Sequence, residues 1–278
     1  MPRRLFRASP SKLLAWVDCP RRYRMQYLDR PAPPSRPQRA HTSVGVAVHN
    51  ALRDWWDLPV ERRSPAAGAE LVRSSWIDVG FRDADQSIAW RERAQGQVVA
   101  YLDDVDPAHQ PLGIERTVSL KTEVFTLQGR IDRLDDRAGE LAVVDYKMSR
   151  WEPTDDDART SLPLALYAAA VWKMFRRKCV RVELHHLPSG SVASHEHSGE
   201  SLKRKIDEAE SIAREARRAE DDYAELGVDS SRFPANVGPI CQWCDFRAHC
   251  PAGQAFGPEK SDWAALEQPA PAAAGDLS

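Results

Sequence analysis

The chain has 278 residues, of which 42% are hydrophobic and 29% are charged, a composition typical of a globular protein with one large domain or two small ones. It has no run of about eighteen apolar residues and no apolar segment behind its basic start, so we expect neither a membrane span nor a secretory signal, and we expect a cytoplasmic location. The net charge of −2 conceals a basic segment at 1–40, with ten Arg or Lys residues against two Asp residues. Such a segment is either a solvated chain end or a surface that faces a polyanion.

The predicted elements follow from caps and hydrophobic periodicity. A helix is expected at 9–28, where Ser9 precedes Pro10 in a helix-start pattern. The four prolines of 31–39 predict an extended linker. The later elements, in chain order, are helices at 43–58, 69–80 and 86–104, strands at 114–120, 123–134 and 140–147, a helix at 161–177, strands at 179–187 and 191–197, and a charged helix at 200–225.

This order predicts an α/β or α+β fold with a central mixed sheet of about five strands flanked by helices. The first three strands should pair antiparallel, because their connections are too short for crossovers. The expected parts of the chain are a basic N-terminal helix and linker at 1–40, a core at 41–227 with a helical insertion at 60–105, a cysteine-bearing segment at 228–255 and a disordered tail at 256–278.

Acidic residues and a lysine stand at the ends of two neighbouring strands. Asp145 and Lys147 are two residues apart, so their side chains share one face of the strand and Tyr146 points to the other. Pairing with the preceding strand would bring Asp132 close to Asp145, and two such carboxylates repel each other unless a cation lies between them. Asp-x-Lys alone is more often a surface ion pair. An acid, a turn, and then an acid with a lysine, however, form the arrangement that metal-assisted phosphodiester hydrolysis needs.

At this point the residues resemble the PD-(D/E)XK nucleases, in the RecB-type exonuclease branch. "GRID" at 129–132 and "DYK" at 145–147 look like the two signature motifs, and Gly45 and His49 look like a third, helical one. The resemblance implies a restriction-endonuclease-like core and a Mg²⁺- or Mn²⁺-dependent DNA nuclease. It implies Asp132, Asp145 and Lys147 as catalytic residues, and His49, Asp132, Asp145 and the main-chain carbonyl of Tyr146 as metal ligands.

Three further positions bear on this resemblance. Glu115 stands on the first strand of the meander, where relatives often carry an acid, and Tyr167 matches the tyrosine of the family's Gln-Leu-x-x-Tyr helix. We expect both to support the site. Pro163 stands where that motif has its glutamine. Proline is tolerated in a first helical turn but has no side-chain amide, so this departure from the motif leaves the rate of cleavage or the substrate preference undetermined.

Four of the five cysteines lie near the two chain ends. Cys241, Cys244 and Cys250 form a C-x2-C-x5-C cluster, which in a cytoplasmic chain indicates a metal rather than disulfides. The fourth ligand would be the nearby His249 or the distant Cys19, and a zinc site is one interpretation. Cys179 opens a strand and is expected to be a small buried hydrophobic residue.

The resemblance favours Cys19 as the fourth ligand. AddB-type exonucleases and CRISPR-adaptation nucleases hold a 4Fe–4S cluster with one early and three late cysteines, and the early one precedes a Pro and an aromatic residue, as Cys19 precedes Pro20 and Tyr23. The implied ligands are Cys19, Cys241, Cys244 and Cys250, and thiolates suit such a cluster. Joining the chain ends would stabilise the fold by about 4–5 kcal/mol, if it acts like a disulfide of that span.

Two classes of function follow. The first is a DNA exonuclease in repair or recombination, acting on single-stranded DNA or free ends, by itself or with a separate helicase, because the chain has no P-loop motif. The second is a non-catalytic role, as a weak or inactive DNA-binding subunit of a helicase–nuclease complex or a zinc-stapled nucleic-acid-binding protein. The candidate DNA contacts are Arg21, Arg22, Arg24 and, as a base-stacking platform, Trp151.

Overall fold

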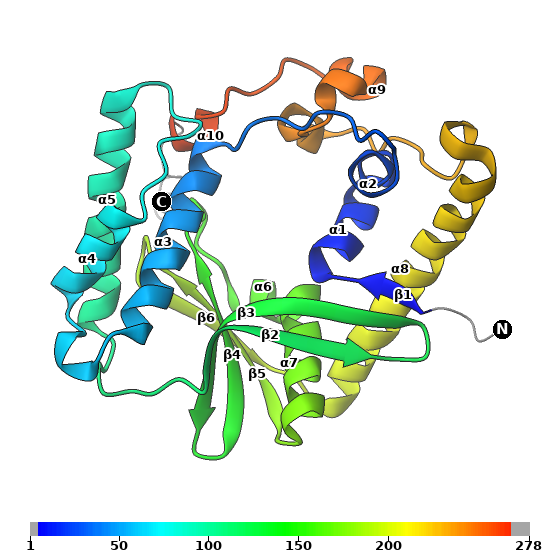
Figure 1. The fold of residues 1–278 in the computed structure, drawn as a ribbon. Helices are drawn as coiled ribbons and strands as arrows, with labels where there is room; N and C mark the ends of the chain where they lie inside the picture. Colours follow the sequence, from blue (N-terminus) through cyan, green and yellow to red (C-terminus); the bar gives the residue numbers. More distant parts are fainter. Residues whose placement is uncertain (1–4, 268–278) are drawn as a thin grey trace, which may run out of the picture.

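The computed structural model describes residues 5–267 and contains a six-stranded mixed sheet with helices on both of its faces (Figure 1). The strands are β1 (Phe6–Ala8), β2 (Gly113–Lys121), β3 (Phe125–Arg137), β4 (Glu140–Lys147), β5 (Cys179–His186) and β6 (Ser191–Glu196). The helices are α1 (Pro10–Asp18), α2 (Pro20–Tyr27), α3 (Ala40–Asp57), α4 (Pro65–Ser74), α5 (Ala84–Asp103), α6 (Asp155–Thr160), α7 (Leu162–Phe175), α8 (Gly199–Leu226), α9 (Pro251–Gln254) and α10 (Ala264–Glu267). Short 3-10 turns lie at Val60–Arg62, Gly227–Asp229, Pro239–Trp243 and Arg247–His249.

The long strand β3 organises the sheet. β2 runs antiparallel along one side of it, while its other side pairs with β1 in parallel and then with β4 in antiparallel orientation. The sheet continues through β5, parallel to β4, to β6. The predicted mixed α/β architecture and the antiparallel pairing of β2, β3 and β4 are confirmed. The sixth strand is the three-residue β1, which no sequence pattern predicts.

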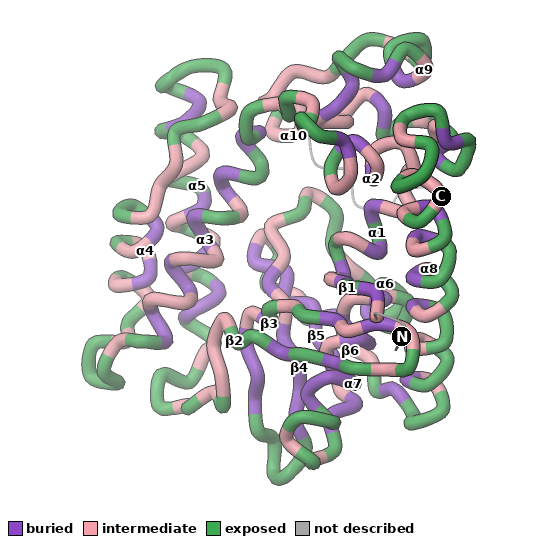
Figure 2. Tube along the Cα trace, turned by 45° about the vertical axis from the view of Figure 1, so that its right-hand side comes forward, coloured by how far each residue is buried: buried purple, intermediate pink, exposed green. Residues whose placement is uncertain are grey.

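Two hydrophobic cores cover the two faces of the sheet. α7, α8 and α1 pack with Val143 and its neighbours in one core, whereas α3, α4 and α5 pack with Val144 and Tyr146 in the other. Successive residues of β4 therefore face different helical layers, as the strand period of two requires. α7 carries buried residues over most of its length, because it lies between the sheet and α8. Figure 2 shows the buried residues in the strands and along the sides of the helices that face them.

The helix predicted at 9–28 is two helices, with the break at Cys19. Ser9 caps α1 by accepting a hydrogen bond from the Lys12 main-chain N–H at 3.1 Å. Pro20 opens α2, and the residue before a proline is driven to an extended conformation, which Cys19 adopts with a φ of −166°. The break places Cys19 at a corner between two helices. The short helix α6 is also absent from the prediction.

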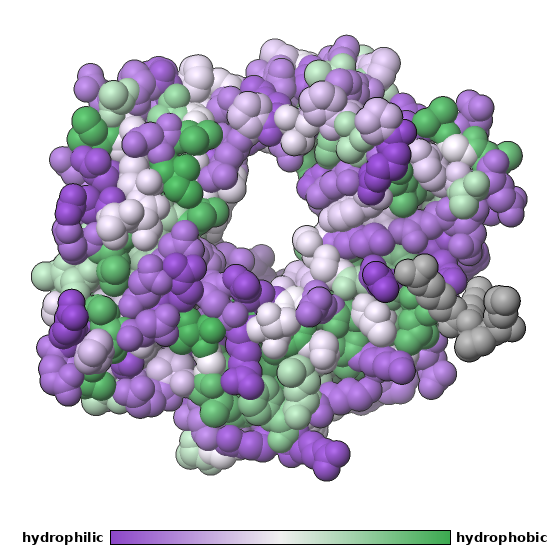
Figure 3. Space-filling view, in the orientation of Figure 1, coloured by the Kyte–Doolittle hydropathy of each residue, from purple (hydrophilic) through white to green (hydrophobic). Residues whose placement is uncertain are grey.

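The N-terminal and C-terminal segments close a ring above the sheet. Residues 31–39, which have no regular secondary structure, lead from α2 to α3 and lie beside the C-terminal segment. Arg36 forms ion pairs with Glu259 and with Asp262, the latter at 3.1 Å, and the Ala40 N–H donates to the Asp262 carbonyl at 3.2 Å. The space-filling view shows an opening through the molecule, bounded below by the sheet and above by these segments (Figure 3).

Order extends further toward the C-terminus than the tail predicted at 256–278. The Lys260 N–H donates to the Gln242 carbonyl at 3.1 Å, and Glu267 at the end of α10 pairs with Arg82 at 2.8 Å. The rest of the expected tail, 268–278, lies outside the described residues. Within residues 5–267, no helix is both long enough and apolar enough to cross a membrane.

Candidate active site

Three acidic residues lie side by side on three neighbouring strands. On β3, Arg133 pairs with the residue before Glu115 on β2 and with the residue before Asp145 on β4. The antiparallel register therefore places Asp132 between Glu115 and Asp145. Asp132 and Asp145 were predicted to be neighbours on these strands; Glu115 joins them because β2 continues the same register.

His49 reaches this group from α3. Its Nδ1 atom lies 3.3 Å from Asp132 Oδ2, and its Nε2 atom lies 3.1 Å from the main-chain oxygen of Tyr146. Asp132 Oδ2 also accepts a hydrogen bond from the Tyr146 main-chain N–H at 2.8 Å. One potential ligand atom each from His49, Glu115 and Asp132 lies within 4.8 Å of the other two. This nitrogen and oxygen set fits a divalent cation such as Mn²⁺ or Mg²⁺.

Asp145 and Lys147 form an ion pair beside this group. Their Oδ2 and Nζ atoms are 2.6 Å apart, with both side chains partly exposed. The structure thus brings together the four expected side chains, His49, Asp132, Asp145 and Lys147, and the main chain of Tyr146. The result is a cluster of carboxylates that could surround a cation, with an ammonium group beside it.

The ionisation of the site reflects its crowded negative charge. Burial raises the pKa of Glu115, and the Asp132 carboxylate raises it further. Burial also raises the pKa of Asp145; Lys147 opposes this effect and Asp132 adds to it. Burial by itself lowers the pKa of His49, but the hydrogen bond and charge of Asp132, with the other carboxylates, outweigh it and raise the pKa. A cation placed among these groups would relieve their mutual repulsion.

Glu115 joins the site with a strained backbone conformation. Its φ is 45°, in the left-handed region that a residue other than glycine rarely adopts. Such a conformation costs on the order of 1–3 kcal/mol and persists where the surrounding structure imposes it. The strain coincides with a potential ligand, and the sequence gives no sign of it.

Tyr167 and Pro163 both lie on α7. Burial, with the charges of Asp145 and Asp132, raises the pKa of Tyr167 to about 12, so its hydroxyl remains protonated near the carboxylates. Pro163 lies in the first turn of α7, which Ser161 caps by accepting from the Leu164 N–H at 3.3 Å. The proline therefore fits the helix without loss of a main-chain bond.

Much of the basic N-terminal segment is engaged with protein groups. Arg22 pairs with Asp18 at 3.3 Å and Arg24 with Asp29 at 3.2 Å, while Arg21 Nε donates to the Phe233 carbonyl at 3.4 Å. Further pairs in the segment are Lys12–Glu220, Arg36–Asp262 and Arg39–Asp245. These contacts weaken the interpretation of 1–40 as a free phosphate-binding arm. Trp151, by contrast, is 59% exposed, with Arg150 packed on its ring at 4.5 Å.

The four expected cluster cysteines line one cavity. Cys19, Cys241, Cys244 and Cys250 surround a space of about 30 Å³. The Cys19 sulfur accepts from the Asn236 N–H and the Cys250 sulfur from the Gly253 N–H, both at 3.4 Å. Of the other candidates, His249 is exposed and Cys179 is buried in β5.

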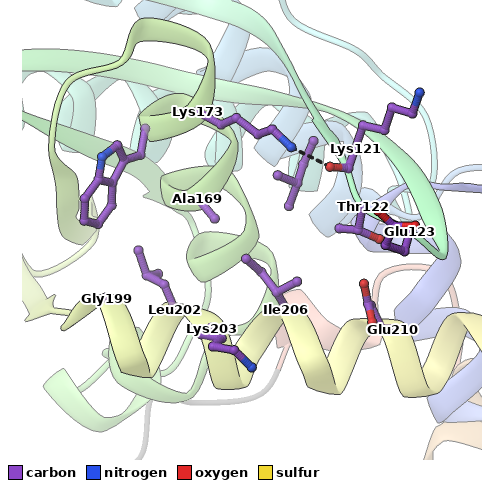
Figure 4. A pocket seen from close by; sticks show the side chains of 12 residues that line it. Lys121, Thr122, Glu123, Ala169, Lys173, Gly199, Leu202, Lys203, Ile206 and Glu210 are labelled. Atoms are coloured by element: carbon purple, nitrogen blue, oxygen red, sulfur yellow. Dashed lines mark hydrogen bonds between the residues drawn. The ribbon is translucent and has the colours of Figure 1, made fainter.

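Another cavity, of about 710 Å³, lies between the β2–β3 turn, α7 and α8 and shares no lining residue with the acidic cluster. Leu202 and Ile206 of α8 point into it, with Ala169 of α7 opposite, and Lys173 Nζ donates to the Lys121 carbonyl at 2.7 Å at its rim (Figure 4). Because this space has an apolar floor and contains none of the residues of the acidic cluster, it is not the candidate catalytic site.

The chain matches a known protein family over most of its length. The family model described as "PD-(D/E)XK nuclease superfamily" matches residues 7–251. A crystal structure of a "Putative exonuclease" from Eubacterium rectale is similar at 10% identity and a TM-score of 0.48, covering 77% of this chain and 81% of that one. The crystal structure of SSO0001 is similar at 15% identity and a TM-score of 0.31, covering 76% of this chain and 85% of that one. No curated protein matches the sequence.

Proposed function

Because the chain belongs to the PD-(D/E)XK nuclease superfamily, we propose that it is a metal-dependent DNA exonuclease of RecB type, stabilised by a 4Fe–4S cluster and acting in DNA repair or recombination. The observation that carries this proposal is the meeting of His49, Glu115 and Asp132 within 4.8 Å, directly beside the Asp145–Lys147 pair. A catalytically inactive relative would have no need to keep these five side chains, His49, Glu115, Asp132, Asp145 and Lys147, together at one place.

His49, Glu115 and Asp132 would hold a Mg²⁺ or Mn²⁺ ion, with Asp145 and the Tyr146 carbonyl completing the site. The bound ion would polarise the scissile phosphate and lower the pKa of the attacking water. The Asp145 carboxylate forms an ion pair with the Lys147 ammonium group and keeps that group directed at the site. Lys147 is 41% exposed in its side chain, so its ammonium group can neutralise charge that develops on the phosphate.

The shape of the molecule favours a substrate with an end. A single DNA strand that passes through the opening seen in Figure 3 would run above the sheet that carries the site. Entry into a closed ring requires a free end, whereas a covalently closed circle would be excluded. Trp151 is exposed four residues after Lys147 and would offer a face on which a base can stack.

The cysteine cavity supports the cluster in preference to zinc. Four thiolates around one Zn²⁺, at about 2.3 Å from the metal, would touch one another and leave no space between them. The four cysteines instead line, together with eight other residues, a cavity of about 30 Å³, and we take this space beside the sulfurs as support for a cluster. The N–H groups that point at two of the sulfurs are of the kind that stabilises thiolate ligands. The cluster would hold α2 against the C-terminal segment and so keep the ring closed.

The proposed activity is tested with anaerobically purified protein and end-labelled single- and double-stranded DNA. We expect shortening of the strands with Mg²⁺ or Mn²⁺ and none with EDTA. Intact DNA in every metal, under conditions where the DNA is shown to bind, would favour the inactive-subunit alternative. Iron and sulfide near four each per chain are expected; one zinc and no iron would replace the cluster with the zinc site.

A further inference from the structure

Tyr146 contributes its main chain and its side chain to different parts of the molecule. Its N–H donates to Asp132 and its carbonyl oxygen contacts His49 Nε2, so its peptide groups belong to the candidate site. Its side chain lies in the other layer, packed among residues of α3 and α5. A displacement of the packed ring can therefore be passed on to main-chain atoms of the site.

Two buried donors hold the Tyr146 hydroxyl. Trp56 Nε1 and Arg133 Nη1 each donate to it at 3.1 Å. Tyr146, Trp56 and Arg133 are between 4% and 5% exposed, so water cannot readily replace a lost bond. The position of the hydroxyl is thereby fixed from two directions.

The two donors stand on the elements that carry the rest of the site. Trp56 is on α3, two turns after His49, and Arg133 directly follows Asp132 on β3. Tyr146 itself directly follows Asp145 on β4. The Tyr146 hydroxyl thus connects α3, β3 and β4, the three elements that carry the His49 nitrogen and the carboxylates of Asp132 and Asp145.

Asp135 holds Arg133 through both of its carboxylate oxygens, and a wider network surrounds this pair. Arg133 Nη2 donates to Asp135 Oδ2 at 3.0 Å, and its Nη1 donates to the Tyr101 hydroxyl at 3.1 Å. That hydroxyl lies 2.9 Å from His185 Nδ1, and His185 Nε2 lies 3.0 Å from Glu183 Oε2. All of these side chains are buried, and a buried hydrogen-bonded network of this kind restricts the motion of its members.

We propose that the Tyr146 hydroxyl is a positioning group for the metal site: through Trp56 and Arg133 it holds α3, β3 and β4 at the spacing that the ligands require. The proposal rests on the proposed function, since it explains how that site is pre-organised. The Tyr146 side chain would thus affect catalysis without touching the substrate, because small displacements of reacting groups cost large factors in rate.

The competing explanation is that the hydroxyl only satisfies a polar core. Tyr101 distinguishes the two. It is the same residue type, it is 8% exposed, and its hydroxyl bonds Arg133 in the same network. Its main chain, however, belongs to α5 and carries no residue of the site. Tyr101→Phe therefore removes an equivalent buried hydroxyl without releasing β4.

The experiment compares the wild-type protein with Tyr146→Phe and Tyr101→Phe. It measures kcat and KM on single-stranded DNA and Mn²⁺ affinity by electron paramagnetic resonance, well below the melting temperature of each variant. Tyr146→Phe should lower kcat about 10- to 100-fold and weaken Mn²⁺ binding about tenfold, as loss of an outer-shell partner does, with KM changed less than about threefold. Tyr101→Phe should stay within about threefold of wild type in all three.

Equal losses in the two variants, or a Tyr146→Phe protein with wild-type kcat and Mn²⁺ affinity, would overturn the proposal. If Tyr146→Phe does not fold, Trp56→Phe removes one donor from the same hydroxyl and should weaken Mn²⁺ binding in the same direction; unchanged binding would overturn it. A wild-type protein that binds Mn²⁺ but cuts no DNA would refute the nuclease function, while the Mn²⁺ affinities would still decide the positioning role.

Discussion

Tyr167 of α7 packs so closely on Gly129 of β3 that a Cβ atom at position 129 would collide with the Cε1 atom of the tyrosine ring. The glycine of "GRID" is therefore required by a contact with another side chain, since its own φ is not in the left-handed region. The contact links the helix after the lysine strand to the strand of Asp132.

Gly129→Ala should displace Tyr167 from the site. Overpacking of this kind costs about 1–3 kcal/mol, and we expect a lower melting temperature and at least a tenfold loss in the rate of DNA cleavage. Gly96→Ala is the matched control, because a Cβ at Gly96 in α5 meets no atom within 4 Å and Gly96 belongs to none of the motifs. It should stabilise the protein by about 0.5–1 kcal/mol with activity retained. A Gly129→Ala protein as stable and active as wild type would disprove the role of the contact.

Lys147→Ala and Asp145→Ala should separate chemistry from metal binding. Both variants should lose DNA cleavage by at least about a hundredfold, because the first removes the ammonium group and the second removes a carboxylate that completes the site. Only Asp145→Ala should weaken Mn²⁺ binding, which titration calorimetry measures. Circular dichroism checks that both remain folded. Full activity in Lys147→Ala would show that residues 145–147 are not the catalytic motif.

Stability should fall on mild acidification because of His197. This residue is 2% exposed; burial, with the nearby His195 and Lys205, lowers its pKa to about 4. In the unfolded chain the ring titrates near 6.5. The stabilisation is therefore complete above about pH 6.5 and is lost as the pH falls toward 4, by up to about 3 kcal/mol.

Melting temperatures at pH 7.5 and pH 5.5 check this effect. His197→Gln should show a smaller decrease between the two pH values than wild type. His249→Gln, the same change at an exposed histidine far from this site in the sequence, should keep the wild-type decrease. Identical pH dependence in wild type and His197→Gln would assign the acid sensitivity to other groups.

The cysteine cavity predicts which substitutions remove the cluster. Replacing Cys19, Cys241, Cys244 or Cys250 by Ala should abolish the visible absorbance of anaerobically purified protein and lower its melting temperature, since the two chain ends are no longer joined. Cys179→Ala and His249→Ala are the controls and should keep the colour. A coloured Cys19→Ala protein beside a colourless His249→Ala protein would contradict the assignment of Cys19.

Those parts of the fold that depend on local patterns could be predicted from the sequence. Alternation of apolar residues predicts β2 to β6, and the motif order predicts that His49, Asp132, Asp145 and Lys147 meet. β1 could not be predicted, because three residues carry too little pattern and their pairing with β3 is long-range. The break at Cys19 was within reach, since Pro20 restricts the residue before it. The capping box of Thr154 and Asp157 likewise marks the start of α6.

The full participation of Glu115 could not be predicted. Its carboxylate joins His49 and Asp132 only because β2 and β3 pair in one particular register and because its backbone adopts a φ of 45°. Neither register nor strain is visible in "GIERTVSL". The network behind Tyr146 is hidden for the same reason, since Trp56, Arg133 and Tyr101 come from three separate elements.

We propose that this chain cuts DNA from an end at the cluster of His49, Glu115, Asp132, Asp145 and Lys147. The most direct measurement incubates anaerobically purified wild-type and Lys147→Ala proteins with linear and covalently closed circular single-stranded DNA of one sequence, in the presence of Mn²⁺. We expect the wild-type protein to degrade the linear strand and leave the circle intact, while Lys147→Ala degrades neither. Equal degradation of both DNAs by the wild-type protein, or degradation that persists in Lys147→Ala, would contradict it.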